Sequence, residues 1–227
     1  MTSILNIISP NIFLQGITSQ SLTVTLAIII ITALVSIAAF NNQTLMYRLN
    51  LNPYMVVHRN QWYRVLSHGF VHADWIHLFV NMFVLFSFGR AVERYFQVAE
   101  YEGFLTNPIL HFLLIYFLGM FISTVVTVGK HKDNYQYNAV GASGAVSAIV
   151  FASIFFNPTS TLLLFAVIPM PAFVFGILFL AYSQYMQRRG GDNVNHNAHF
   201  IGAVFGFIYP LLINPEMIKI YFLNQLF

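Results

Sequence analysis

Six long apolar windows dominate the sequence, and they decide what kind of fold the chain can adopt. They lie at about residues 22–40, 75–96, 108–129, 141–157, 161–186 and 197–214. A helix needs about 20 apolar residues to cross the hydrocarbon core of a bilayer. Only 7% of the residues are charged, against roughly 25% in an ordinary soluble domain. The pattern predicts an all-α polytopic membrane protein, with residues 1–227 forming a single domain of six membrane-spanning helices.

The connection between the first two windows, residues 41–74, is long and mixes aromatic, aliphatic and arginine residues. Such a mixture is typical of the membrane interface, so we expect this first loop to be membrane-associated. The window 22–40 carries no group suited to chemistry and is expected to be a plain helix facing lipid and its neighbours. The first twenty residues contain no Lys or Arg. They therefore lack the basic region of a cleavable signal peptide, and the first span should be retained.

Two of the windows have unusual geometry. The window 141–157 has 17 residues, which gives about 25 Å of helix for a hydrocarbon core of about 30 Å. A polar run precedes it, so we expect the end that carries Ser143 to lie below the membrane surface, where water can reach it. The window 161–186 contains Pro169 and Pro171, which are expected to kink its helix.

Ser143 lies among the smallest side chains of the chain, in the stretch YNAVGASGAVSAIVFA. By themselves, small residues indicate close helix packing, and a serine among them usually bonds to its own helix. Gly202 and Gly206 form a GxxxG face that we expect to pack against the small residues after Gly141. This packing would bring Ser143 close to His199. A neutral imidazole that accepts the hydroxyl proton would then make the serine a usable nucleophile.

The proposed pair needs donors aimed at an oxyanion, and three are available. No carboxylate lies inside the last three windows to orient the histidine, so the unit would be a dyad. His77 and Asn81 lie one turn apart on one helix face, and the Ser143 amide is the third candidate donor. Polar side chains this deep in a span favour a functional role. His77 and Asn81 could equally bond to neighbouring helices.

Four segments carry these residues in order: HGFVHADWIHLFVNM (68–82), FGRAVER (88–94), GASG (141–144) and HFIGAVFG (199–206). In these segments the sequence resembles the rhomboid family of intramembrane serine proteases. The resemblance implies a six-transmembrane-helix rhomboid-like bundle and a serine endopeptidase that cleaves transmembrane segments of other membrane proteins. It implies Ser143 as nucleophile and His199 as base, and an oxyanion site formed by His77, Asn81 and the Ser143 amide.

The resemblance also implies structural positions, which are a histidine and an arginine of the first loop and three helix-packing glycines: His72, Arg64, Gly141, Gly202 and Gly206. There are two departures. In the family, a tryptophan and an arginine form a pair in the first loop. Here the order is Trp62-Tyr63-Arg64, so the tryptophan is shifted by one position. Many family members also carry an aromatic residue four positions after the serine, packed against the histidine ring, where this chain has Ser147. What braces the His199 ring is therefore left open.

Three other interpretations compete with the protease. His68, His72 and His77 are closely spaced and could suggest a metal site. HExxH is absent and acidic residues are scarce in the windows, so we expect neither a metal nor another cofactor. A catalytically inactive relative that binds and escorts membrane proteins is a second alternative, but such relatives typically lose the serine or the histidine. The third alternative, a transporter, is disfavoured because no ionisable pair lies near a span centre and the sequence shows no evident repeat.

The expected partners are transmembrane protein substrates and the lipid bilayer, with no nucleic acid; the oligomeric state is not predicted. We expect an integral, multi-pass protein of the cell membrane, meaning the plasma or inner membrane. The resemblance implies cytoplasmic termini and a site that opens outward, and we give it more weight than the positive-inside bias, which predicts the reverse. Basic residues on the serine side outnumber those opposite (Arg48, Arg59, Arg64, Lys130, Lys132, Arg188 and Arg189 against Arg90, Arg94 and Lys219).

Overall fold

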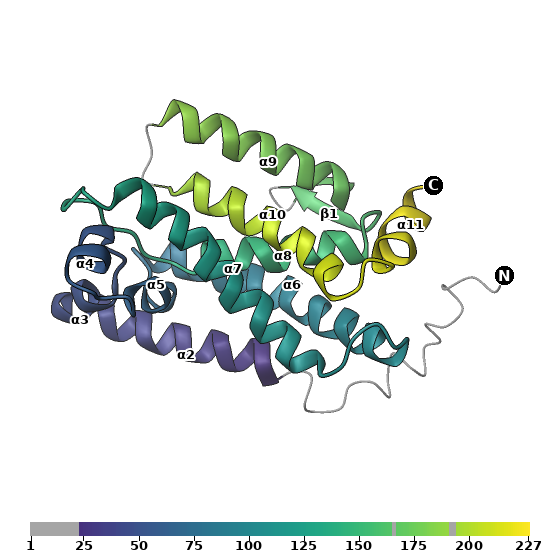
Figure 1. Ribbon diagram of the computed structural model, residues 1–227, viewed down its shortest axis with the longest axis horizontal. Helices are drawn as coiled ribbons and strands as arrows, with labels where there is room; N and C mark the ends of the chain where they lie inside the picture. The colour runs from purple at the N-terminus through teal and green to yellow at the C-terminus, as the bar shows by residue number, and fades with distance from the viewer. Residues whose placement is uncertain (1–22, 165–166, 191–193) are drawn as a thin grey trace.

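A computed structural model describes residues 23–164, 167–190 and 194–227 and shows a bundle of helices (Figure 1). Each apolar window contains one long helix, and these are α2 (Thr23–Phe40), α6 (Trp75–Tyr101), α7 (Pro108–His131), α8 (Ser143–Phe156), α9 (Ala172–Arg189) and α10 (His196–Ile213). In the described part of the chain, α6, α7 and α10 are long and apolar enough to cross a membrane, whereas Val24–Phe40 and α8 are shorter apolar helices. The expectation about a signal peptide concerns residues 1–20, which lie outside the described residues.

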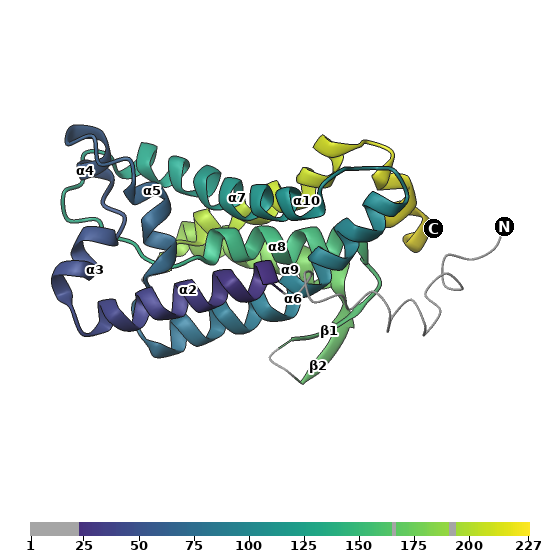
Figure 2. The ribbon, with the colours of Figure 1, turned by 90° about the horizontal axis from the view of Figure 1, so that it is seen from below.

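The shortest of these helices, α8, lies in the middle of the bundle (Figure 2). Of its 14 residues, 13 are buried, and α6, α7, α9 and α10 all pack against it. Ala145, Ala148 and Ala152 are completely buried, and their small side chains let the neighbouring helices come close. At about 1.5 Å per residue the helix is roughly 21 Å long. Its central position explains why small and apolar side chains make up most of the helix.

The packing of α8 against α10 that the glycines predict is confirmed. A Cβ atom on Gly202 would collide with the carbonyl oxygen of Gly144, and one on Gly206 would collide with that of Ala148. Both contacts are between backbones, so neither neighbour can move aside alone. Only glycine lets the two helices approach this closely at these positions.

The prediction of one kinked helix over 161–186 is wrong for its first part. Thr161–Leu164 forms strand β1 and Ile168–Pro171 forms strand β2, and the two pair antiparallel with Thr161 opposite Pro171. This hairpin projects from the helix bundle (Figure 2). Proline lacks an amide hydrogen and forces the preceding residue into an extended conformation, so Pro169 and Pro171 favour a strand over a helix here. The helix α9 begins only after Pro171.

The first loop, residues 41–74, is made of short helical segments. These are α3 (Gln43–Leu49), α4 (Pro53–His58), α5 (Arg64–Ser67) and the 3₁₀ helix η2 (His68–Phe70). The side chains of Asn42 and Asn52 cap α3 and α4 by accepting backbone amides of the first turn. The segments α4 and α5 pack against α7, at the end of the bundle where α8 and α10 begin (Figure 1). The C-terminal segments η3 (Ile218–Leu223) and α11 (Asn224–Leu226) lie at the other end.

Candidate active site

Ser143 and His199 meet where α8 and α10 begin. Ser143 is the first residue of α8 and His199 the fourth residue of α10. His199 Nε2 lies 2.7 Å from Ser143 Oγ, which is a hydrogen-bond distance. Both side chains are half-buried. When the proton of the neutral imidazole is on Nδ1, Nε2 has a free lone pair that can accept the serine hydroxyl.

The start of α10 is fixed by Asn195, which the sequence analysis did not single out. Its Oδ1 accepts the Ala198 amide at 3.0 Å and so caps the helix. Its Nδ2 donates to Thr127 Oγ1 of α7 at 2.9 Å. One side chain therefore caps α10 and ties it to α7, one turn before His199. An asparagine just before a predicted helix was the available signal.

The turn before Ser143 requires glycine. Gly141 has φ of +110°, a conformation that other residues rarely adopt. A Cβ atom there would also lie 2.7 Å from Cε1 of the His77 ring. The Gly141 amide donates to the His68 carbonyl at 2.9 Å. Gly141 thus lets the His77 ring lie against the backbone two residues before the serine.

His77 and Asn81, the two side chains expected at an oxyanion site, lie in the first two turns of α6. Asp74 caps this helix by accepting the His77 amide at 2.8 Å. Asn81 is buried, and its Nδ2 donates to the His77 carbonyl at 3.0 Å. An asparagine amide has a second N–H, which this bond leaves available. The structure brings the His77 ring to the serine turn, and the role of both residues as oxyanion donors stays a prediction.

His72 is held by α2, so the expectation that the first window is a plain helix is wrong. Ser36 Oγ donates to the Phe70 carbonyl at 2.9 Å and lies 3.0 Å from His72 Nδ1. The histidine is fully buried, and burial, with a smaller contribution from the neighbouring His77, lowers its pKa from 6.5 to about 3. Its ring stands edge-on to the His77 ring at 5.0 Å between centroids. His72 is therefore a neutral ring that packs against the His77 ring.

The sequence signal for this role of α2 was a polar stripe. Thr25, Thr32 and Ser36 are spaced seven and four residues apart, which places them on one helix face, and all three are fully buried. At the other end of the stripe, the Thr25 amide donates to Glu93 Oε1 of α6 at 2.8 Å. The face of α2 that carries these residues is turned to the bundle, not to lipid.

Arg64 is the most deeply buried cation of the first loop, with 2% of its surface exposed. One guanidinium nitrogen donates to the carbonyls of Tyr47 and Asn50, both at 2.7 Å, and Nε donates to Gln61 Oε1 at 2.7 Å. These carbonyls belong to the C-terminal end of α3, where a helix favours positive charge. The ring of Tyr63 lies 5.5 Å from the guanidinium carbon. Arg64 thus holds the first loop together.

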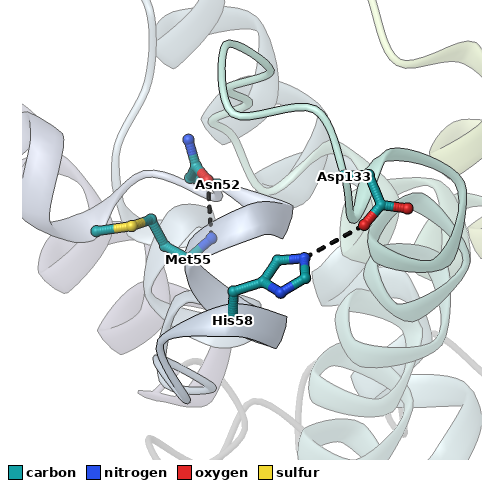
Figure 3. A network of polar contacts seen from close by, with 4 residues as sticks. All are labelled: Asn52, Met55, His58 and Asp133. Atoms are coloured by element: carbon teal, nitrogen blue, oxygen red, sulfur yellow. Dashed lines mark hydrogen bonds and ion pairs between the residues drawn. The ribbon is translucent and has the colours of Figure 1, made fainter.

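The same loop is tied to the chain that leads into Ser143. Leu51 and Ala139 exchange two backbone hydrogen bonds, at 2.9 Å and 3.0 Å. Figure 3 shows His58 of α4 reaching Asp133 at 3.3 Å, beside the cap that Asn52 makes on the same helix. Because these contacts join residues far apart in the sequence, no local pattern predicted them. They fix the position of the serine turn relative to α4.

The three closely spaced histidines point in different directions. His68 Nδ1 lies 3.0 Å from the Arg64 carbonyl, and its Nε2 lies 3.3 Å from Thr124 Oγ1 of α7. His72 turns to Ser36, and the His77 ring lies against Gly141. Among the described residues, no three histidine or acidic side chains gather closely enough to hold a metal ion. The geometry favours three separate structural or polar roles for these rings.

Comparison with known proteins gives two findings. A family model described as the Rhomboid domain matches residues 59–216. The curated "RHOMBOID-like protein 12, mitochondrial" of Arabidopsis thaliana is 29% identical over 201 residues, which cover 84% of this chain. The chain spans 58% of the length of that relative. Every candidate site residue named above, from Arg64 to Gly206, lies inside the segment that the family model matches.

Proposed function

Since the chain belongs to the rhomboid family, we propose that it is an intramembrane serine endopeptidase that cleaves transmembrane segments of other membrane proteins. The observation that carries the proposal is the 2.7 Å distance between Ser143 Oγ and His199 Nε2. These two residues come from different helices, and the glycine contacts between α8 and α10 hold them together. A serine with only a structural role usually bonds to its own helix. Ser143 instead lies within hydrogen-bond distance of a histidine from another helix.

The proposed reaction begins when His199 Nε2 takes the hydroxyl proton and Ser143 Oγ bonds to the carbonyl carbon of the substrate peptide. The carbonyl oxygen becomes an oxyanion. His199 then gives its proton to the leaving nitrogen as the carbon–nitrogen bond breaks, which leaves an ester on Ser143. Water then bonds to the ester carbon while His199 accepts one of its protons. The bond between this carbon and Ser143 Oγ breaks, His199 returns the proton to Oγ, and the carboxylic acid product leaves.

The oxyanion needs donors, and the Ser143 amide is one of them. Amides of the first helical turn have no partner within the helix, and they lie at its positive end. We propose Asn81 Nδ2 and the His77 ring as further donors, because the His77 ring lies against the turn that carries the serine. One donor of this kind typically contributes ~10²–10³ in rate. Asn81 and His77 would share this contribution with the amide.

The protein is an integral membrane protein, as its family and its apolar helices show. The length of α8, roughly 21 Å against a core of about 30 Å, supports a serine that lies below the membrane surface. The expected location in the plasma or inner membrane of the cell stays a prediction, because the name of the Arabidopsis relative places that protein in mitochondria.

Arg64 also bears on the orientation that we propose, with the site opening away from the cytoplasm. The positive-inside bias counts cations near the span ends. Arg64 is buried and bonded to protein carbonyls, so it is not a free interfacial charge. Without Arg64, the excess of basic residues on the serine side is smaller by one. The conflict between the positive-inside bias and the orientation that the family implies is reduced accordingly.

The proposal is tested by incubating the purified protein with a serine-reactive fluorophosphonate and with a single-span membrane protein substrate. We expect Ser143→Ala to abolish labelling and cleavage without changing the unfolding temperature, since it removes only one half-buried hydroxyl. Labelling of the mutant would show that the nucleophile is another residue. A parent protein that binds the substrate but neither labels nor cleaves would favour the inactive escort protein.

A further inference from the structure

The His199 ring lies against an aromatic side chain from α9. The rings of Phe179 and His199 are stacked, with 6.4 Å between centroids and 25° between planes. We propose that Phe179 is a positioning residue for the base, whose ring holds the His199 imidazole with Nε2 directed at Ser143. The inference rests on the proposed function and names a residue that the motifs did not indicate.

Phe179 is itself held firmly on its other sides. Its ring lies 5.6 Å from that of Phe151 of α8 and 6.0 Å from that of Phe175, one turn earlier in α9. Gly176, on the same face of α9, brings the two helices together, because a Cβ there would already lie 3.3 Å from Ile154 Cδ1. A side chain packed against two helices has little rotamer freedom. It can therefore restrain the ring that it touches.

The position four residues after the serine does not supply a ring. Ser147 is buried, with 7% of its surface exposed, and the residues one turn before it on α8, Ser143 and Gly144, carry no ring either. The ring face of His199 is therefore met by α9, not by α8. As a consequence, nucleophile, base and brace come from three different helices, and the proposed brace acts only while α9 is docked on α8 and α10.

The test compares Phe179→Ala with Phe179→Tyr and with a matched control, Phe173→Ala. Phe173 is also a half-buried phenylalanine of α9, but it lies six residues, or about 9 Å, from Phe179 along the helix. We measure the rate constant of fluorophosphonate labelling, kcat and KM on a single-span membrane substrate, and the unfolding temperature in detergent.

We expect Phe179→Ala to lower kcat and the labelling rate constant by about tenfold or more, because small misplacements of a catalytic group have large effects. KM should change much less, since the substrate does not need the brace to bind. Phe179→Tyr keeps a stacking ring and should stay within about threefold of the parent. Phe173→Ala should lower the unfolding temperature about as much as Phe179→Ala, and leave kcat within about threefold.

Two results would overturn the inference. One is a Phe179→Ala protein whose kcat and labelling rate equal those of the parent. The other is an equal loss of kcat in Phe173→Ala, which would show that any truncation on α9 acts through stability. Failure of the proposed function would look different from either result. The parent protein itself would then not be labelled at Ser143, and the parent and Ser143→Ala would behave alike.

Discussion

Gly202 of α10 faces the backbone of Gly144 of α8 so closely that a methyl group on Gly202 would collide with the Gly144 carbonyl oxygen. Gly144 directly follows Ser143, and Gly202 lies one turn after His199. One of the two close approaches of these helices therefore lies beside the two residues of the proposed dyad. Backbone packing fixes how far apart the starts of α8 and α10 lie.

Gly202→Ala should force α8 and α10 apart, and we expect a loss of about 1–3 kcal/mol or more in the free energy of unfolding, as for overpacked cores. Activity should fall with it, because Ser143 and His199 separate. Thermal unfolding in detergent measures the first effect. Gly129→Ala in α7 is the control, since a Cβ there meets no atom within 4 Å. Equal stability of the two variants would contradict the packing described.

His199→Ala should be inactive, whereas His196→Ala should keep most of the parent activity. His196 is buried and its ring lies edge-on to the His199 ring at 6.0 Å, so it is near the dyad. The hydrogen bond to Ser143, however, comes from His199. Labelling and cleavage assays of both variants check this assignment, and the reverse pattern of activity would overturn it.

Asn81→Ala and His77→Ala should each reduce the rate in a graded way, by at most ~10²–10³, because several donors share the oxyanion. Fluorophosphonate labelling of Ser143 should be partly retained. Excess chelator should leave the parent fully active. A metal site would give the opposite result, with complete loss in His77→Ala and inhibition by chelator that added zinc reverses.

Ser147→Tyr should lower activity by about tenfold or more. Phe151 lies one turn after Ser147 on the same face of α8, and the ring of Phe179 already stacks on His199. A second large side chain would have to displace one of them, which in a packed interior is unfavourable. Turnover is measured with the same membrane substrate. A rate at or above that of the parent would show that space for the ring exists.

His68 should make the fold sensitive to acid. Burial lowers its pKa from 6.5 to about 4. Between these values the unfolded chain binds a proton that the folded protein excludes, so stability falls as the pH decreases from 6.5 to about 4. The full loss is on the order of 3 kcal/mol. The unfolding temperature of His68→Gln should therefore fall less than that of the parent between pH 7 and pH 5.

The parts of the fold that follow from local pattern were predictable. The apolar windows located the long helices, and the GxxxG register of Gly202 and Gly206 identified the partner of α8. The hairpin was missed because a short apolar run has the same composition in a strand and in a helix. Pro169 and Pro171 were the discriminating residues, and they were interpreted as a kink.

The candidate site also contains residues that local sequence pattern indicates and residues that it does not. Ser143, His199, His77 and Asn81 could be named as candidates because each belongs to a motif or to one face of a helix. The neighbours that support them were missed, because contacts such as Phe179 with His199 depend on how α9 is rotated, and its sequence is apolar on most sides. Ser36 was missed for a different reason: the high average apolarity of its window hides the polar stripe of Thr25, Thr32 and Ser36 within it.

The order of the two helix starts along the chain has a consequence for biosynthesis. Ser143 and His199 are 56 residues apart, and a ribosome adds about 5–20 residues per second. The serine is therefore made roughly 3–11 s before the histidine that would activate it. Since α10 supplies both the proposed base and the glycines that pack on α8, we expect that the proposed activity cannot appear before α10 is made.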